Sequence, residues 1–184
     1  PGGYFIDSKG EKQLCGNGNF ADVSVFSFHP VKHIATGEGG MATTNCKELY
    51  EKLCLYRTHG ITKNPALLHE NHGGWYYEMQ ELGYNYRITD FQAALGISQL
   101  KRADMGLARR QEIARRYREG LSDLKGVKLP FVSDQVFHAY HLFIIQVEDR
   151  LGLYDYLHKS NIYAQVHYVP LHLTPYYKQL GNKE

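Results

Sequence analysis

The first part of the chain alternates short apolar runs with polar turns, a pattern that predicts brief strands. Residues 4–13 predict a hairpin that turns at residues 7–10. The β-branched and aromatic run of residues 23–28 predicts a largely buried strand, which Pro30 ends by removing a backbone donor. Residues 40–44 then predict the strand that returns from the intervening loop.

Helical spacing follows in three places. Asn45 with Glu48 three residues later predicts a helix start. A second helix start is marked by residues 89–92, Thr-Asp-Phe-Gln, a capping box. The expected buried stripes of the first helix and of a third, arginine-rich helix are Leu49, Leu53 and Tyr56, and Leu107, Ile113, Tyr117, Leu121 and Leu124.

The second half of the pattern is less regular. A long irregular segment, residues 59–81, carries many aromatic side chains, and loops of this length in compact domains are often functional. Gly126 and Pro130 interrupt the helical pattern and predict a domain boundary, giving domains of residues 1–126 and 127–184. The expected elements of the second domain are a strand at 139–147, a helix at 151–159 and a strand at 163–168.

Composition narrows the class of protein. The chain has 184 residues, 43% apolar and 22% charged, which is typical of a soluble globular protein, and it contains no apolar run long enough to span a bilayer. A net charge of +2 does not imply a nucleic-acid partner, and the arginines of the third helix are expected to face water or a subunit. Three cysteines without a Cys-x-x-Cys pair favour a reducing cytoplasm. Because the first residues are neither a start nor a signal peptide, we expect the chain to be part of something longer.

Candidate chemistry begins with Lys32, just past the strand of residues 23–28. Ligands collect outside the carboxyl ends of strands in open α/β sheets, and a lysine held among apolar neighbours loses solvation, which favours the nucleophilic neutral amine. Glycines at positions 37, 39 and 40 allow positive φ and a close approach to a planar ring, while Ser27 offers a hydroxyl for a phosphate oxygen. An exposed loop lysine is the ordinary alternative.

Four ordered blocks, residues 27–40, 57–60, 83–96 and 165–172, make a more specific pattern. They read Ser-Phe-His-Pro-Val-Lys followed by Thr-Gly-Glu-Gly-Gly, then Arg-Thr-His-Gly, then Gly-Tyr-Asn-Tyr-Arg-Ile-Thr-Asp-Phe-Gln-Ala-Ala-Leu-Gly, then Gln-Val-His-Tyr-Val-Pro-Leu-His. Together they resemble the DegT/DnrJ-type sugar aminotransferases, which are pyridoxal 5′-phosphate enzymes. Within the family, the run of residues 18–32, which begins Gly-Asn-Phe-Ala-Asp, and the Gln-Val-His-Tyr block are most similar to the branch that makes 4-amino-4,6-dideoxy sugars for surface glycans, including the pseudaminic acid branch.

The resemblance implies an α/β fold: part of the three-layer α/β/α large domain of fold type I, followed by the start of a small α+β domain. Lys32 would be the catalytic residue that holds the cofactor through its amine, with Ser27 binding the phosphate and Asn85 reaching the cofactor of a neighbouring subunit. Substrate contacts would come from His29, His167 and Tyr76. The family also has an Asp-x-x-His segment that keeps the pyridine nitrogen protonated; this chain lacks it, and Asp7 lies in the wrong local context to replace it.

The implied reaction moves an amino group from glutamate to a 4-keto-6-deoxy nucleotide sugar in a cytoplasmic homodimer with shared active sites. On this interpretation the 184 residues alone would have little or no transaminase activity. Two other functions stay open. A sugar dehydratase of the same fold is disfavoured because its lysine is typically replaced by histidine, and a non-catalytic binding or regulatory module would retain only the scaffold.

Ten histidines raise the alternative of a metal site. The closest candidate pair, His138 and His141, would place its rings on opposite faces of the predicted strand, and no cysteine or carboxylate stands at a recognisable ligand spacing. The sequence therefore predicts no metal site.

Overall fold

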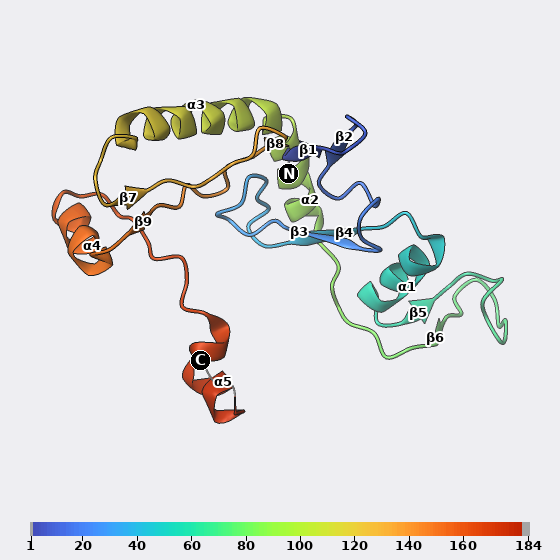
Figure 1. The fold of residues 1–184 in the computed structure, drawn as a ribbon. Helices are drawn as coiled ribbons and strands as arrows, with labels where there is room; N and C mark the ends of the chain where they lie inside the picture. The colour runs from blue at the N-terminus through green and yellow to red at the C-terminus, as the bar shows by residue number, and fades with distance from the viewer. Residues whose placement is uncertain (1, 182–184) are drawn as a thin grey trace. The chain divides into compact units, whose positions relative to one another are not determined.

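The computed structural model describes residues 2–181, whose contacts divide into two units (Figure 1). The first unit runs through residue 113 and includes 132–141; the second comprises 114–131 and the residues from 142 onward. The predicted boundary between residues 126 and 127 stays a prediction. None of the helices within 2–181 is both long enough and apolar enough to cross a membrane.

The first unit opens with the predicted hairpin. β1 (Tyr4–Ile6) pairs antiparallel with β2 (Lys12–Leu14), and β8 (Val136–Phe137) pairs with the other edge of β1. Asp7 fixes the turn because its Oδ1 accepts the backbone N–H groups of Lys9 and Glu11, both at 2.9 Å. The Glu11 N–H, followed by the Gln13 amide, lowers the pKa of the Asp7 carboxyl. Asp7 is therefore a turn residue, as its sequence context indicates.

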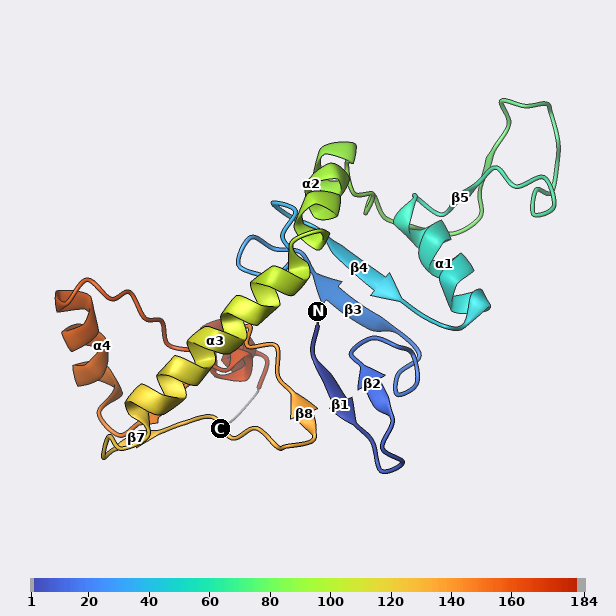
Figure 2. The ribbon, with the colours of Figure 1, turned by 90° about the horizontal axis from the view of Figure 1, so that it is seen from above.

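A second hairpin carries the loop of residues 28–39, which contains Lys32 and is called the lysine loop below. β3 (Ser24–Ser27) pairs antiparallel with β4 (Gly40–Thr43), and the two strands lie side by side in both ribbon views (Figures 1 and 2). The expectation that this strand is largely buried is wrong, since Val25 is 79% exposed. Within the described residues β4 is the only strand beside β3, so the side chains of β3 lack a second strand to cover them.

The next helix, α1 (Lys47–Arg57), begins one residue later than predicted. Cys46 occupies the N-cap position, while the Asn45 amide donates to the carbonyl of Asn17 at 2.9 Å. Asn45 therefore ties the helix start to an earlier turn instead of capping it. The expected buried stripe of α1 is only half-buried at Leu49 and Leu53 and is exposed at Tyr56.

Residues 59–81 are irregular apart from a minimal antiparallel pair, β5 (Ile61–Thr62) and β6 (Glu78–Met79). Beyond them, α2 (Asp90–Leu100) starts with the predicted capping box: Thr89 accepts the Gln92 N–H, and the Gln92 side chain accepts the Thr89 N–H. The arginine-rich helix is confirmed as α3 (Ala103–Leu121). Its ion pairs Arg109–Glu112 and Arg115–Glu119 lie within the helix.

Within the predicted second domain, residues 127–184, the helix is confirmed as α4 (Arg150–Lys159), but the strands are largely wrong. Of residues 139–147, only β9 (Gln146–Val147) is a strand, and it pairs with β7 (Val127–Lys128). Earlier in that segment Tyr140 has φ 48°, which breaks an extended backbone. Residues 163–168 form no strand because no segment within 2–181 pairs with them; the chain then continues into a short 3-10 helix (Leu171–Leu173) and α5 (Pro175–Gln179).

Burial is concentrated at the lysine loop. Among residues 2–181 the buried apolar side chains are Ile34 and Ala114, each only 2% exposed. Thr36, two residues after Ile34, is 3% exposed, and Gly96 of α2 is buried beside it. The end of the loop between β3 and β4, at Ile34 and Thr36, is therefore buried against α2.

Candidate active site

The lysine loop is closed by backbone hydrogen bonds at its two ends. Phe28 N–H donates to the Gly39 carbonyl at 2.8 Å, and Thr36 N–H donates to the Phe28 carbonyl at 2.9 Å. At the tip of the loop, Lys32 N–H donates to the His29 carbonyl at 2.9 Å. The backbone on either side of Lys32 is thus fixed by bonds that depend on the β3–β4 pairing.

Two glycines allow this loop to close. A Cβ at Gly40 would lie 2.8 Å from the Phe26 carbonyl oxygen, and a Cβ at Gly39, where φ is 153°, would lie 2.5 Å from Thr36 Oγ1. From the sequence, we expected these glycines to let the backbone pass close to a planar ring. In the structure they permit the close approach of the loop to its own strand.

Helix α2 holds the loop from the side. The carbonyl of Glu38 accepts two hydrogen bonds, from Gln92 Nε2 at 2.9 Å and from Thr36 Oγ1 at 2.6 Å. The same Gln92 side chain uses its Oε1 to accept the Thr89 N–H at 3.0 Å. One amide therefore starts α2 and ties that helix to the turn before β4.

Gln92→Glu separates these two functions. Glutamate keeps an oxygen to cap Thr89, but it replaces the donor to the Glu38 carbonyl with a carboxylate that repels it. We expect helix content to be unchanged and amide hydrogen exchange of residues 36–40 to accelerate by about 10-fold, because the Glu38 carbonyl loses the one of its two donors that ties the turn to α2. Hydrogen-exchange mass spectrometry makes the comparison.

The control is Gln99→Glu on the same helix, because the Gln99 side chain makes no hydrogen bond with another described residue. Exchange of the loop should be unaffected by that change. Equal rates of amide hydrogen exchange at residues 36–40 in Gln92→Glu and in the unmodified protein would show that Gln92 does not hold the loop.

Three of the predicted site residues lie together in the β3–β4 hairpin. Lys32 is half-buried, with its Nζ 3.5 Å from Nε2 of His141. Ser27 is the last residue of β3, and its exposed hydroxyl accepts only a long bond of 3.4 Å from the His29 N–H. The His29 ring is half-exposed and lies 3.9 Å from the Glu38 carboxylate.

This donor set fits a phosphorylated aldehyde. A half-buried amine can form a covalent bond with a carbonyl carbon, and a hydroxyl whose hydrogen is not committed to the protein can donate to a phosphate oxygen. The hydroxyl stands on the last residue of β3, which pairs with Gly40 of β4, and the amine stands on the loop that this pairing closes.

Asn85 lies at a different place in the first unit. It forms an isolated antiparallel bridge with Thr58, flanked by bonds from Tyr84 N–H to the Tyr56 carbonyl (2.7 Å) and from Tyr86 N–H to the Arg57 carbonyl (2.9 Å). Its side chain is exposed and makes no hydrogen bond with another residue of 2–181. The backbone is therefore anchored while the amide is available to an external group.

Tyr76 belongs to the irregular segment and points its hydroxyl at Glu78 Oε1, 3.2 Å away. Glu78 organises this segment: its carboxylate, 12% exposed, accepts the backbone N–H groups of His69 and Glu70, each at 2.9 Å. These N–H groups, with that of His69 contributing most, lower the pKa of Glu78 to about 2. Burial, and then the Glu78 charge, raise the pKa of the Tyr76 phenol, so Tyr76 remains a donor.

Glu78→Gln should loosen this segment. Because the pKa of Glu78 is below its ordinary value of 4.5, the carboxylate's stabilising effect is complete above that pH and is lost as pH falls toward 2. The neutral amide accepts the same N–H groups more weakly, so we expect exchange of the His69 and Glu70 amides to accelerate by about 10-fold at pH 7.

Glu81→Gln, an exposed position just outside the pair of β strands, is the matched control for that measurement. Protection of the two amides that survives in Glu78→Gln would show that the carboxylate does not organise the segment.

The remaining predicted residue, His167, is in the second unit. It is exposed and its ring is tilted by 32° against that of Tyr168, with centroids 4.1 Å apart. His138 and His141, the candidate metal-binding pair, have different partners. His138 Nδ1 accepts the Tyr140 N–H at 3.0 Å, whereas His141 faces Lys32. No group of three or more metal-ligand side chains occurs in the described part of the chain.

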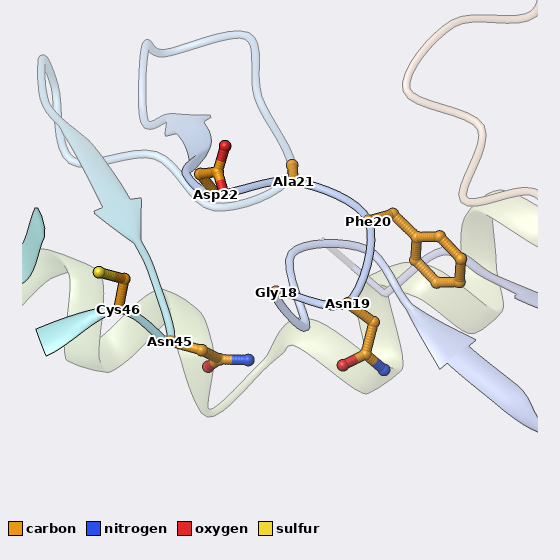
Figure 3. A pocket seen from close by; sticks show the side chains of 7 residues that line it. All are labelled: Gly18, Asn19, Phe20, Ala21, Asp22, Asn45 and Cys46. Carbon is orange, nitrogen blue, oxygen red and sulfur yellow. The ribbon is translucent and has the colours of Figure 1, made fainter.

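A separate pocket of about 480 Å³ lies between the turn after β2 and the start of α1 (Figure 3). Its lining includes the polar side chains of Asn19, Asp22 and Asn45, and none of the predicted site residues. The full lining set is Gly18, Asn19, Phe20, Ala21, Asp22, Asn45 and Cys46.

Sequence reasoning missed three residues that shape these sites. Gln92 was visible as a capping residue, but its bond to the Glu38 carbonyl spans 54 residues and leaves no local pattern. His141 was noticed only as half of a histidine pair. Glu78 carried no signal, because its partners are backbone groups that the fold brings together.

Comparison with known proteins gives a consistent result. A family model described as the DegT/DnrJ/EryC1/StrS aminotransferase family matches residues 10–184. The spore coat polysaccharide biosynthesis protein SpsC of Bacillus subtilis is 41% identical over 178 residues, covering 91% of this chain and 45% of SpsC. A UDP-4-amino-4,6-dideoxy-N-acetyl-beta-L-altrosamine transaminase of Campylobacter jejuni is 39% identical over 171 residues, covering 89% of this chain and 43% of the relative.

Solved structures agree. The Streptococcus pneumoniae protein Spr1654 in its PMP-form superposes with a TM-score of 0.84 at 32% identity, covering 98% of this chain and 46% of that one. The α/β fold class expected from the sequence is thereby confirmed. The chain spans less than half the length of the curated relatives it matches.

Proposed function

Because the chain belongs to the DegT/DnrJ/EryC1/StrS aminotransferase family, we propose that the full-length protein is a pyridoxal 5′-phosphate-dependent aminotransferase that aminates a keto sugar carried on a nucleotide. The observation that carries the proposal is Lys32: a half-buried amine on a loop that is closed between β3 and β4 and clamped by α2. A half-buried amine on a backbone held in place is suited to covalent chemistry on an aldehyde.

Lys32 would act twice. Its amine would hold the cofactor aldehyde, and after displacement by the amino donor it would remain tethered within reach of the proton that moves during the transfer. The cofactor, when bound, supplies the electron sink that stabilises the carbanion. The protein's contribution is to keep the amine close to one place throughout both half-reactions.

Other residues would bind the cofactor and substrate. The free hydroxyl of Ser27 suits a phosphate oxygen, and the exposed amide of Asn85, on its anchored backbone, suits a phosphate of the neighbouring subunit's cofactor. We propose three substrate contacts: His29, which is on the lysine loop, and Tyr76 and His167, which are not. Their ring nitrogens and phenol can bond sugar hydroxyls or the nucleotide.

The names of the relatives favour a surface-glycan sugar as substrate. SpsC is named for spore coat polysaccharide biosynthesis, the Campylobacter relative for transamination of a 4-amino-4,6-dideoxy sugar, and another, 34% identical, is the GDP-perosamine synthase of Escherichia coli O157:H7. We therefore propose a 4-keto-6-deoxy nucleotide sugar as acceptor and glutamate as donor. The full-length protein would work as a cytoplasmic homodimer, since Asn85 would serve the partner's cofactor.

Incubation of the full-length protein with a panel of keto sugar nucleotides and glutamate tests the proposal. The expected product is an amino sugar nucleotide formed with stoichiometric 2-oxoglutarate, and the protein should be yellow until glutamate bleaches it. Loss of a sugar hydroxyl without amination would indicate a dehydratase instead. A colourless protein that binds the nucleotide sugars unchanged would indicate a binding module.

A further inference from the structure

The amine of Lys32 has a polar neighbour from a distant part of the chain. Its Nζ lies 3.5 Å from Nε2 of His141, a residue 109 positions later, and both side chains are half-buried. This separation is at the outer limit of a hydrogen bond, and the lysine stem is flexible.

His141 itself is held from two sides. Arg110 of α3 donates its Nη1 to the carbonyls of Tyr140 (3.2 Å) and His141 (3.4 Å). The His141 ring lies edge-on to His33, with centroids 5.8 Å apart and planes at 70°. The backbone at His141 is thus held by α3, and its ring lies against the lysine loop with Nε2 near the end of the Lys32 side chain.

The chemistry of the neighbouring groups favours this pairing. A guanidinium has no acceptor, so Arg110 cannot accept a hydrogen bond from the Lys32 amine. Imidazole Nε2 can take either role, accepting from the ammonium or donating to the lone pair of the neutral amine. His141 can therefore bond Lys32 in both of its protonation states.

We propose that His141 is a positioning residue that holds the amine of Lys32 through its Nε2. The catalytic consequence of this bond rests on the proposed function: the bond would keep the displaced amine at the position from which it moves a proton. The contact itself can be measured without turnover.

The first test labels lysines in the cofactor-free full-length protein with an amine-acylating reagent and follows each site by mass spectrometry. Either form of the hydrogen bond slows acylation, since it keeps a proton on the amine or occupies its lone pair. We expect His141→Phe to accelerate labelling of Lys32 by about 3-fold or more, and His141→Gln, which retains a polar atom near Nε2, to leave it close to the unmodified rate. Lys9 and Lys159, both exposed, are internal references.

The two variants separate hydrogen bonding from packing. Phenylalanine preserves the ring shape and removes the polar atom, whereas glutamine does the reverse. If packing alone mattered, glutamine would be the disruptive change. Equal labelling of Lys32 in all three proteins, or acceleration by glutamine alone, would overturn the proposal whether or not the protein is an aminotransferase.

The second test measures steady-state amination. His141→Phe should lower kcat by about 10-fold or more with little change in the KM for the sugar nucleotide, because only the placement of the amine is lost, and His141→Gln should recover most of kcat. His138→Asn, which keeps an acceptor for the Tyr140 N–H, is the control and should match the unmodified protein. An unchanged kcat in His141→Phe would refute the positioning function.

Discussion

Replacement of Lys32 by alanine should lower the amination rate of the full-length protein by about 1,000-fold or more, because covalent attachment and proton transfer are both lost with one amine. The same change should abolish covalent trapping of the cofactor. Borohydride reduction of the unmodified protein followed by peptide mapping should find the pyridoxyl group on Lys32. The amination rate and the site of the pyridoxyl label are the two quantities to measure.

Lys9→Ala is the matched control, since Lys9 is an exposed residue in the β1–β2 turn and lies outside the lysine loop. Its amination rate and its cofactor content should equal those of the unmodified protein. A label found on a different lysine, with Lys32 unmodified, would refute the assignment of the catalytic amine and with it the proposed mechanism.

Gly60→Ala should be the most damaging change to the fold near Asn85. The added Cβ would lie 1.8 Å from the Glu81 carbonyl oxygen, and the backbone at Gly60 has φ 67°, which only glycine adopts readily. The clash is with backbone and cannot be relieved by a rotamer change. We expect a loss of about 3 to 5 kcal/mol in the free energy of unfolding, measured by urea titration.

Gly106→Ala controls for the chemistry of that substitution. Gly106 lies within α3, and a Cβ there meets no atom within 4 Å, so alanine should stabilise the helix by up to about 1 kcal/mol. Hydrogen exchange of the amides of Tyr84 and Tyr86, whose partners are on the segment before Gly60, localises the damage in Gly60→Ala. Equal unfolding midpoints in the two variants would contradict the close contact between Gly60 and the Glu81 carbonyl.

Near the lysine loop, the sequence predicted the parts that depend on neighbouring residues. The apolar run, Pro30 and the glycines predicted a strand, a loop and a returning strand, and these are β3, the lysine loop and β4. The Thr89 capping box was predicted for the same reason, because hydroxyl, amide and backbone lie within one helical turn. Exposure was predicted less well: Val25 was expected inside, and no local signal shows that β3 lacks a second neighbour.

The sequence by itself determined the family, the β3–β4 hairpin, the Thr89 capping box and the helices α3 and α4, because these follow from residue order, helical period and turn composition. It also singled out Lys32 as the proposed catalytic residue. Tertiary structure alone decided which distant groups meet: Gln92 with the Glu38 carbonyl, His141 with Lys32, and Glu78 with the amides of its own segment. Each of those contacts joins atoms whose proximity depends on how the backbone closes in space. A residue's type limits which bonds it can form, and the fold selects the partner.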